Sequence, residues 1–129
     1  TFATAPKNIC NISASFSAVQ KRLEHVIVEN LDFEHLIKTY DRKEAFFYCD
    51  PPYFESEKYY RAHFDISDHK RLADALHRIK GRFLLSYNDC PQVRDLYADC
   101  IIEPLTRRNT LAAKSIDGYK EVLIRNYKL

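Results

Sequence analysis

The chain has 129 residues, 46% of them hydrophobic, and a formal net charge of +2. This length suits one domain with a single core, and the small charge excludes a polycation that binds nucleic acid regardless of shape. No apolar stretch is long enough to cross a membrane and the first residues do not resemble a signal peptide, so we expect a cytoplasmic protein.

Four cysteines and five histidines are scattered along the sequence. Neither type has the paired spacing of a disulfide framework or a metal site, so we expect reduced thiols and no bound metal. His69 and His77 share one predicted helix but lie two turns apart, and we expect both side chains to be solvated.

Apolar residues show no clear periodicity over residues 1–14, and we expect this segment to lead into the domain. Apolar residues recur at helical spacing over 15–25, which predicts an amphipathic helix. The β-branched run 26–28 predicts a strand ending near Asn30. Asp32 then stands where it can cap a second helix, whose apolar face comprises Phe33, Leu36, Ile37 and Tyr40.

The unbroken apolar run 45–49 predicts a strand that is buried on both faces. A polar and aromatic loop follows over about 51–65, and long loops after buried strands are often functional. The next helix has one apolar stripe, is capped by Asp65 or Ser67, and ends at Gly81.

The last third of the chain predicts a strand at 83–85, a short helix starting at Pro91, and a strand at 100–102. A polar, basic and irregular loop follows over 106–119, and the alternating segment 121–127 predicts a final strand. Because strands alternate with helices, we expect an α/β fold with a mainly parallel sheet.

The tetrapeptide Asp50-Pro51-Pro52-Tyr53 directly follows the predicted strand 45–49. Ligand sites of open α/β sheets lie at the carboxyl ends of strands. The two prolines fix the backbone and remove two amide donors, and Pro51 holds Asp50 extended, with its carboxylate in a defined direction. Together these groups form a rigid, acceptor-rich cup beside an aromatic ring, which suits an amino group on a planar base.

Such a cup would activate the exocyclic amine of adenine. Hydrogen bonds to Asp50 and to a backbone carbonyl would favour a pyramidal nitrogen, which could attack a sulfonium methyl group in line. Tyr53 would stack on a base swung out of a duplex. The alternative interpretation is a surface turn, for which Asp followed by two prolines is ordinary.

Four segments carry a resemblance to a known family. FFYCDPPYF at 46–54 resembles the catalytic motif of amino-methyltransferases. NLDFEHL at 30–36, LLSYND at 84–89 and EVLIRNY at 121–127 resemble other blocks of the Dam-type DNA adenine methyltransferases, in the same order. The chain as a whole therefore resembles the C-terminal catalytic portion of that family.

The resemblance implies transfer of a methyl group from S-adenosylmethionine to N6 of a flipped-out adenine in double-stranded DNA. It assigns the target adenine to Asp50, Pro51, Pro52 and Tyr53. It assigns the cofactor to Asp32, Phe33 and Phe54. Helix capping alone explains Asp32 equally well, Phe33 is equally explained as core, and Phe54 could instead line the base pocket.

Polar and basic residues elsewhere are assigned less firmly. The resemblance implies DNA contact through Tyr60, Arg61, Arg107, Arg108 and Asn109, where arginines would neutralise phosphates, although a solvated basic loop also explains them. The end of the strand at 83–85 carries Ser86, Asn88 and Asp89, which either support the pocket around Asp50 or only cap the strand.

Glycine is the main departure from the family, with two residues where average usage gives about nine. The family's F-x-G-x-G loop is absent. We therefore expect a partial Rossmann-like methyltransferase sheet of about five mostly parallel strands, without the glycine-rich first βα unit. The missing N-terminal part of the same protein would hold most of the cofactor, so these residues alone should bind it weakly and show little or no activity. The absent first strand would leave an apolar sheet edge open to self-association.

Two other interpretations stay open. A methyltransferase acting on an RNA base or a protein amide would use the same cup, although Asp at position 50 and the later blocks favour adenine in DNA. A non-catalytic DNA-binding remnant of a decayed methyltransferase is the second, and the intact tetrapeptide argues against it.

Overall fold

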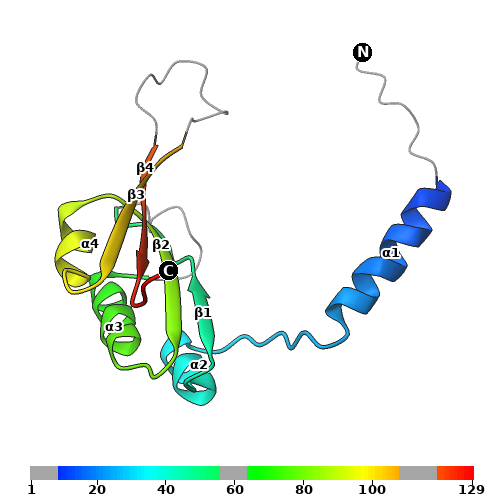
Figure 1. The fold of residues 1–129 in the computed structure, drawn as a ribbon, viewed down its shortest axis with the longest axis horizontal. Helices are drawn as coiled ribbons and strands as arrows, with labels where there is room; N and C mark the ends of the chain where they lie inside the picture. Colours follow the sequence, from blue (N-terminus) through cyan, green and yellow to red (C-terminus); the bar gives the residue numbers. More distant parts are fainter. Residues whose placement is uncertain (1–8, 56–63, 108–118) are drawn as a thin grey trace, which may run out of the picture. The chain divides into compact units, whose positions relative to one another are not determined.

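The computed structural model describes residues 9–55, 64–107 and 119–129, which belong to two compact units, Thr1–Asn30 and Leu31–Leu129. The elements are drawn in Figure 1. Within the described residues, no helix has both the length and the apolar character needed to cross a membrane.

The first unit contains the helix α1 (Ile9–Leu23). The predicted helix at 15–25 is confirmed, although it begins six residues earlier than expected. The apolar stripe formed by Phe16, Val19 and Leu23 is exposed. The strand predicted at 26–28 is wrong, since these residues form no strand and their side chains are exposed. A β-branched run becomes a strand only where a neighbouring strand can satisfy its backbone, and none pairs with it among the described residues.

The second unit begins with α2 (Phe33–Tyr40), which starts where the sequence predicts. The Asp32 side chain accepts a hydrogen bond from the Glu34 amide at 3.0 Å and so caps the helix. The next helix, α3 (Ile66–His77), is capped by Asp65, with the reciprocal bond from Asp68 that completes a capping box. Both helices therefore begin at the start signals that their sequences contain. The predicted stop at Gly81 is wrong, since α3 ends at His77 with Arg78 as its C-cap, and no described glycine has a positive φ.

A four-stranded sheet forms the centre of this unit, in the order β1-β2-β4-β3. Its strands are β1 (Phe46–Cys49), β2 (Arg82–Asn88), β3 (Ile101–Arg107) and β4 (Tyr119–Arg125). β1 and β2 are parallel, whereas β4 is antiparallel to both β2 and β3.

This sheet corrects the expectation of about five mostly parallel strands. The described sheet has four strands, and two of its three pairings are antiparallel. The missing strand is the one predicted at 26–28. The stretch 108–118 between β3 and β4 is shorter than the dozen or more residues that a parallel crossover needs, so these two strands pair antiparallel.

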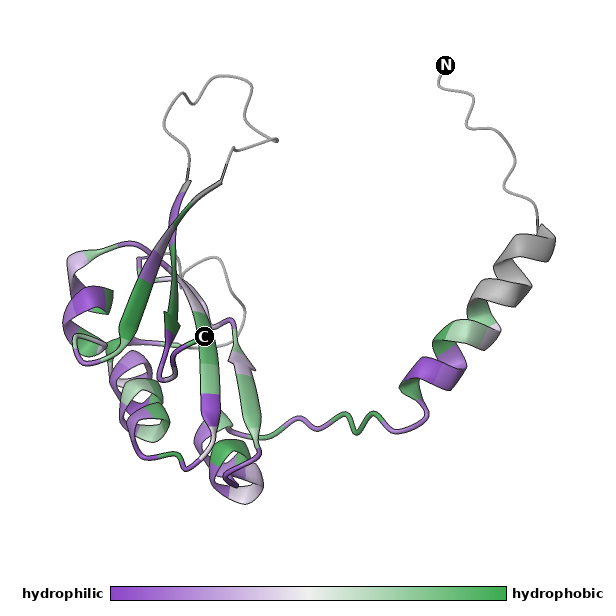
Figure 2. Cartoon of the chain, in the orientation of Figure 1, coloured by the Kyte–Doolittle hydropathy of each residue, from purple (hydrophilic) through white to green (hydrophobic). Residues whose placement is uncertain are grey.

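The core lies where β2 and β4 meet the helices. Alternate residues of β2, namely Phe83, Leu85 and Tyr87, are fully buried, and the hydrophobic segments of the central strands stand out in Figure 2. The short helix α4 (Pro91–Leu96) adds Val93, which is also fully buried. Each such side chain contributes about 1.5–3 kcal/mol when it leaves water.

β1 is an edge strand of the described sheet. Its Phe46 and Tyr48 side chains are 54% and 62% exposed, so the strand is not buried on both faces as its apolar run predicts. An apolar edge was expected at this strand. Self-association through it stays a prediction.

Candidate active site at the ends of β1 and β2

The predicted catalytic tetrapeptide begins at the residue that follows β1. Because β1 and β2 are parallel and pair Cys49 with Leu85, their carboxyl ends lie side by side. Asp50 therefore stands next to Ser86, and the polar end of β2 faces the segment that follows β1. This is the position at which open α/β sheets bind ligands.

The Asp50 carboxylate is held by Ser86. The Ser86 hydroxyl donates to Asp50 Oδ1 at 2.7 Å, and it lies 3.3 Å from the Cys49 carbonyl oxygen. Ser86 is only 8% exposed, whereas Asp50 is exposed. A buried hydroxyl thus orients a carboxylate whose remaining lone pairs face solvent and are open to a ligand.

Asn88 fixes the backbone just after the motif. Its Oδ1 accepts from the Phe54 amide at 3.0 Å, and its Nδ2 donates to the Phe54 carbonyl at 3.2 Å. The next residue, Glu55, has a φ of 67°, in the left-handed region that residues other than glycine rarely adopt. The pair of bonds to Asn88 therefore holds the chain in place immediately before a sharp change in its direction.

Tyr53 is half-buried beside Tyr87, with ring centroids 6.2 Å apart and planes at 40°. Burial raises the pKa of Tyr53 to about 12, with further contributions from the nearby Glu121 and Asp50 carboxylates. The phenol consequently stays neutral at physiological pH. A neutral ring next to an oriented carboxylate is suited to stacking on a base.

Beneath the motif, His69 of α3 is fully buried, which corrects the expectation that its side chain is solvated. Its ring stacks on Phe54, with centroids 4.1 Å apart, and its Nδ1 forms a hydrogen bond with the Tyr87 hydroxyl. The sequence contained a signal for this burial, because position 69 continues the stripe formed by Leu72 and Leu76 at helical spacing.

Two of the three residues predicted to bind the cofactor, Asp32 and Phe33, lie at the start of α2. Asp32 forms an ion pair with Arg71 at 3.0 Å, and the hydrogen bond from Arg71 lowers the pKa of Asp32. The Arg71 guanidinium also lies 4.8 Å from the centroid of the Phe33 ring. Asp32 is therefore both a helix cap and part of a charged cluster.

An aromatic cluster connects Phe33 to Phe54, the residue that follows the predicted catalytic tetrapeptide. The Phe33 ring lies 5.9 Å from Phe64, Phe64 lies 4.8 Å from His69, and His69 stacks on Phe54. The structure thus brings the two predicted groups, at 32–33 and 50–54, into one continuous region. Position 64 was not predicted to take part.

The remaining site predictions are only partly covered by the structure. Arg107 is the last residue of β3, and its side chain is not described. Asp89 forms an ion pair with Arg94 at 2.6 Å rather than with the motif. The other predicted DNA contacts lie outside the described residues, namely Tyr60, Arg61, Arg108 and Asn109.

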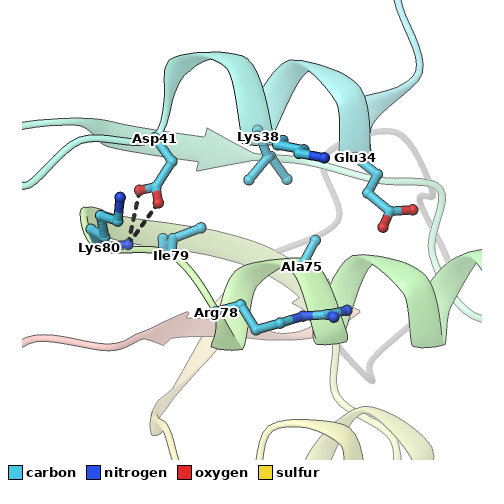
Figure 3. A pocket seen from close by; sticks show the side chains of 8 residues that line it. Glu34, Lys38, Asp41, Ala75, Arg78, Ile79 and Lys80 are labelled. Carbon is cyan, nitrogen blue, oxygen red and sulfur yellow. Dashed lines mark hydrogen bonds between the residues drawn. The ribbon is translucent and has the colours of Figure 1, made fainter.

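A pocket of about 380 Å³ opens between α2 and α3 (Figure 3). Charged side chains of α2 and of the segment that follows α3 line it, and the Asp41 carboxylate at one end accepts from the Lys80 amide at 2.9 Å. None of its lining residues belongs to the tetrapeptide at 50–53; they are Glu34, Ile37, Lys38, Asp41, Ala75, Arg78, Ile79 and Lys80. The α2–α3 pocket is therefore separate from the cup at the strand ends.

Comparison with known proteins gives the family. No curated protein matches the chain. A family model described as D12 class N6 adenine-specific DNA methyltransferase matches residues 7–111, which is well over half of the chain and includes the motif at 50–53. The chain belongs to the D12 class N6 adenine-specific DNA methyltransferases.

Proposed function

We propose that this chain carries the target-base half of the active site and transfers a methyl group from S-adenosylmethionine to N6 of an adenine swung out of double-stranded DNA. Asp50, Pro51, Pro52 and Tyr53 hold the adenine. The single observation that carries the proposal is the Asp50 carboxylate, oriented by Ser86 at 2.7 Å and placed beside the neutral ring of Tyr53.

The mechanism begins with the amino group of adenine, whose lone pair is delocalised into the ring. Asp50 accepts one N–H, and the Pro51 carbonyl, which follows it in the chain, accepts the other. These two bonds favour a pyramidal nitrogen with a localised lone pair, and they stabilise the positive charge that develops on it. Tyr53 stacks on the base, which contributes about 1–3 kcal/mol.

S-adenosylmethionine, when bound, supplies the electrophilic methyl group. The residues near α2 fit its adenine end, because Asp32 offers a carboxylate acceptor and Phe33 offers a half-buried ring. Phe54, which Asn88 holds in place, lies between this region and the base cup through its stack on His69. Asp32, Phe33 and Phe54 are therefore our proposed cofactor contacts.

The proposal retains three expectations from the sequence. A glycine-rich segment outside these 129 residues completes the cofactor site, so the chain alone binds S-adenosylmethionine weakly. Tyr60, Arg61, Arg107, Arg108 and Asn109 contact the DNA backbone, and their arginines make binding depend strongly on salt. A partial Rossmann-like sheet is the architecture that would receive the missing segment.

The test is incorporation of a labelled methyl group by concentrated protein during long incubation. Duplex DNA with adenine, the same duplex with adenine replaced by a purine lacking the amino group, RNA and protein serve as parallel substrates. We expect slow incorporation into adenine DNA alone. Incorporation into RNA or protein instead would favour the first alternative. If none is seen, the same assay is run on these residues joined to the glycine-rich segment, and no incorporation into adenine DNA there would contradict the proposal.

Asp50→Ala is the decisive variant, with Asp95→Ala on the exposed face of α4 as the matched control. We expect Asp50→Ala to abolish incorporation while DNA binding, measured by fluorescence anisotropy, stays within about twofold of the unmodified chain because phosphate contacts dominate affinity. Unchanged methyl transfer by Asp50→Ala would overturn the proposed role of the tetrapeptide.

A further inference from the structure

A second group of chemically reactive side chains lies outside the proposed active site. His77 is the last residue of α3, and Asp99 and Cys100 come just before β3. His77 Nε2 lies 2.7 Å from Asp99 Oδ1, and Cys100 Sγ lies 3.9 Å and 3.7 Å from these two atoms. Three different metal-ligating atoms therefore converge within 4.8 Å of one another.

These distances are close to those of a tetrahedral zinc site. Zinc bonds of about 2.0–2.1 Å to nitrogen, 2.0–2.2 Å to oxygen and 2.3 Å to sulfur separate tetrahedral N and O ligands by about 3.4 Å. They separate sulfur from either by about 3.6 Å. Both sulfur distances in the structure already agree to within about 0.3 Å. Only the hydrogen-bonded His77–Asp99 contact must open, by about 0.7 Å.

Two of the three ligands are held in place by Tyr97, which is fully buried. The His77 ring stacks on the Tyr97 ring, with centroids 5.7 Å apart and planes at 26°. The Cys100 amide donates to the Tyr97 carbonyl at 2.9 Å. Outer contacts that fix the orientation of ligands in this way are a general feature of metal sites.

A fourth coordination position is open to solvent. The three side chains line a pocket of about 400 Å³, and the Asp99 side chain is 71% exposed, so an ion and a water molecule can reach them. Two cationic side chains also line the pocket, Lys128 and Arg125, and the charge of Arg125 is compensated by Glu103. A neutral imidazole, a carboxylate and a thiolate would together balance the charge of Zn²⁺.

We propose that His77, Asp99 and Cys100 bind Zn²⁺ with a water molecule as fourth ligand, and that the ion clamps the end of α3 to the start of β3. An ordinary ion pair explains the His77–Asp99 contact, but it does not explain why the thiol points at the same atoms. No residue spacing in the sequence indicates this site, because 22 residues separate His77 from Asp99. The proposal shares no residue with the methyl-transfer site and does not depend on it.

The test uses the full 129-residue chain with Zn²⁺ and Co²⁺ as probes. Competition with a chromophoric chelator measures the zinc affinity and stoichiometry, and Co²⁺ reports the thiolate ligand through its sulfur-to-metal charge-transfer absorption. We expect one Zn²⁺ per chain, tetrahedral Co²⁺ spectra, and a Tm that rises with Zn²⁺ concentration.

Cys100→Ser and His77→Ala should each weaken zinc binding by about 100-fold or more, since each removes a direct ligand. Cys90→Ser, a half-buried cysteine outside the cluster, is the matched control and should leave the affinity and the Co²⁺ absorption unchanged. Circular dichroism checks that each variant is folded, and Cys100→Ser alone suffices if His77→Ala is not. Failure to bind one equivalent of Zn²⁺, or equal binding by Cys100→Ser, would overturn the site.

Discussion

Asn88→Ala tests whether Asn88 positions the motif for methyl transfer or only stabilises the fold. It removes the two hydrogen bonds, of 3.0 Å and 3.2 Å, that hold the amide and carbonyl of Phe54. At about 0.5–1.5 kcal/mol for each bond, the free energy of unfolding should fall by about 1–3 kcal/mol. The released segment also carries Tyr53, and a displacement of about 1 Å at a reacting centre lowers rates by about 100-fold.

Asn126→Ala is an unusually close control for this experiment. Asn126 makes the same pair of bonds at the other end of β2, accepting from the Phe83 amide at 3.0 Å and donating to the Gly81 carbonyl at 3.1 Å. Urea denaturation should show similar losses of stability in the two variants. The initial rate of methyl transfer, measured where both are folded, should fall about 10–100-fold only in Asn88→Ala. Equal rates in the two variants would refute the positioning role of Asn88.

Three further predictions follow from local packing and charge. Gly81→Ala would place a Cβ 2.6 Å and 2.7 Å from two backbone carbonyl oxygens, so urea denaturation should show a loss of about 1–3 kcal/mol, and an unchanged midpoint would contradict the close approach. Burial raises the pKa of Cys49 from 9.0 to about 11, so its thiolate fraction at pH 8 and its alkylation rate, followed by peptide mass spectrometry, should be about 100-fold below those in the denatured chain. The hydrogen bond from Arg94 lowers the pKa of Asp89, so this pair stabilises the fold above the ordinary pKa of 3.8 and loses that effect as the pH falls through the lowered value. In Asp89→Asn the free energy of unfolding should therefore fall less steeply as the pH is lowered through this range. An unchanged pH dependence would argue against the pair.

The sequence predicted the elements well wherever a local signal existed. The caps Asp32 and Asp65, the apolar run before Asp50 and the strand before Ser86 all have local physical causes. The direction of strand pairing has no such cause, because an apolar run is the same for a parallel and an antiparallel neighbour. The short stretch between β3 and β4 became a signal only with the strand bounds of the structure, because the predicted strands at 100–102 and 121–127 leave a connection long enough for a parallel crossover.

The residues of the candidate site divide in the same way, into those with a local signal in the sequence and those without one. Asp50 and the polar end of β2 could be placed together, because parallel strands end at the same edge of a sheet. The contacts of Ser86 with Asp50 and of Asn88 with Phe54, just after the motif, confirm this placement. The contributions of His69 and Phe64 to this region could not be predicted from the sequence, since they depend on how α3 packs against the sheet. Side chains that meet through tertiary packing leave at most a weak trace in the local sequence.

The geometry around Asp32 resolves a conflict between its two proposed roles. Capping and cofactor binding would compete if the Asp32 carboxylate had no lone-pair position left to accept another hydrogen bond. Its oxygens accept the Glu34 amide and both contacts from Arg71 Nη2, which uses three of about four lone-pair positions. One position therefore remains for an amino group of the cofactor. Because Arg71 also keeps the carboxylate ionised and fixed, the ion pair prepares Asp32 to accept that bond and does not exclude it.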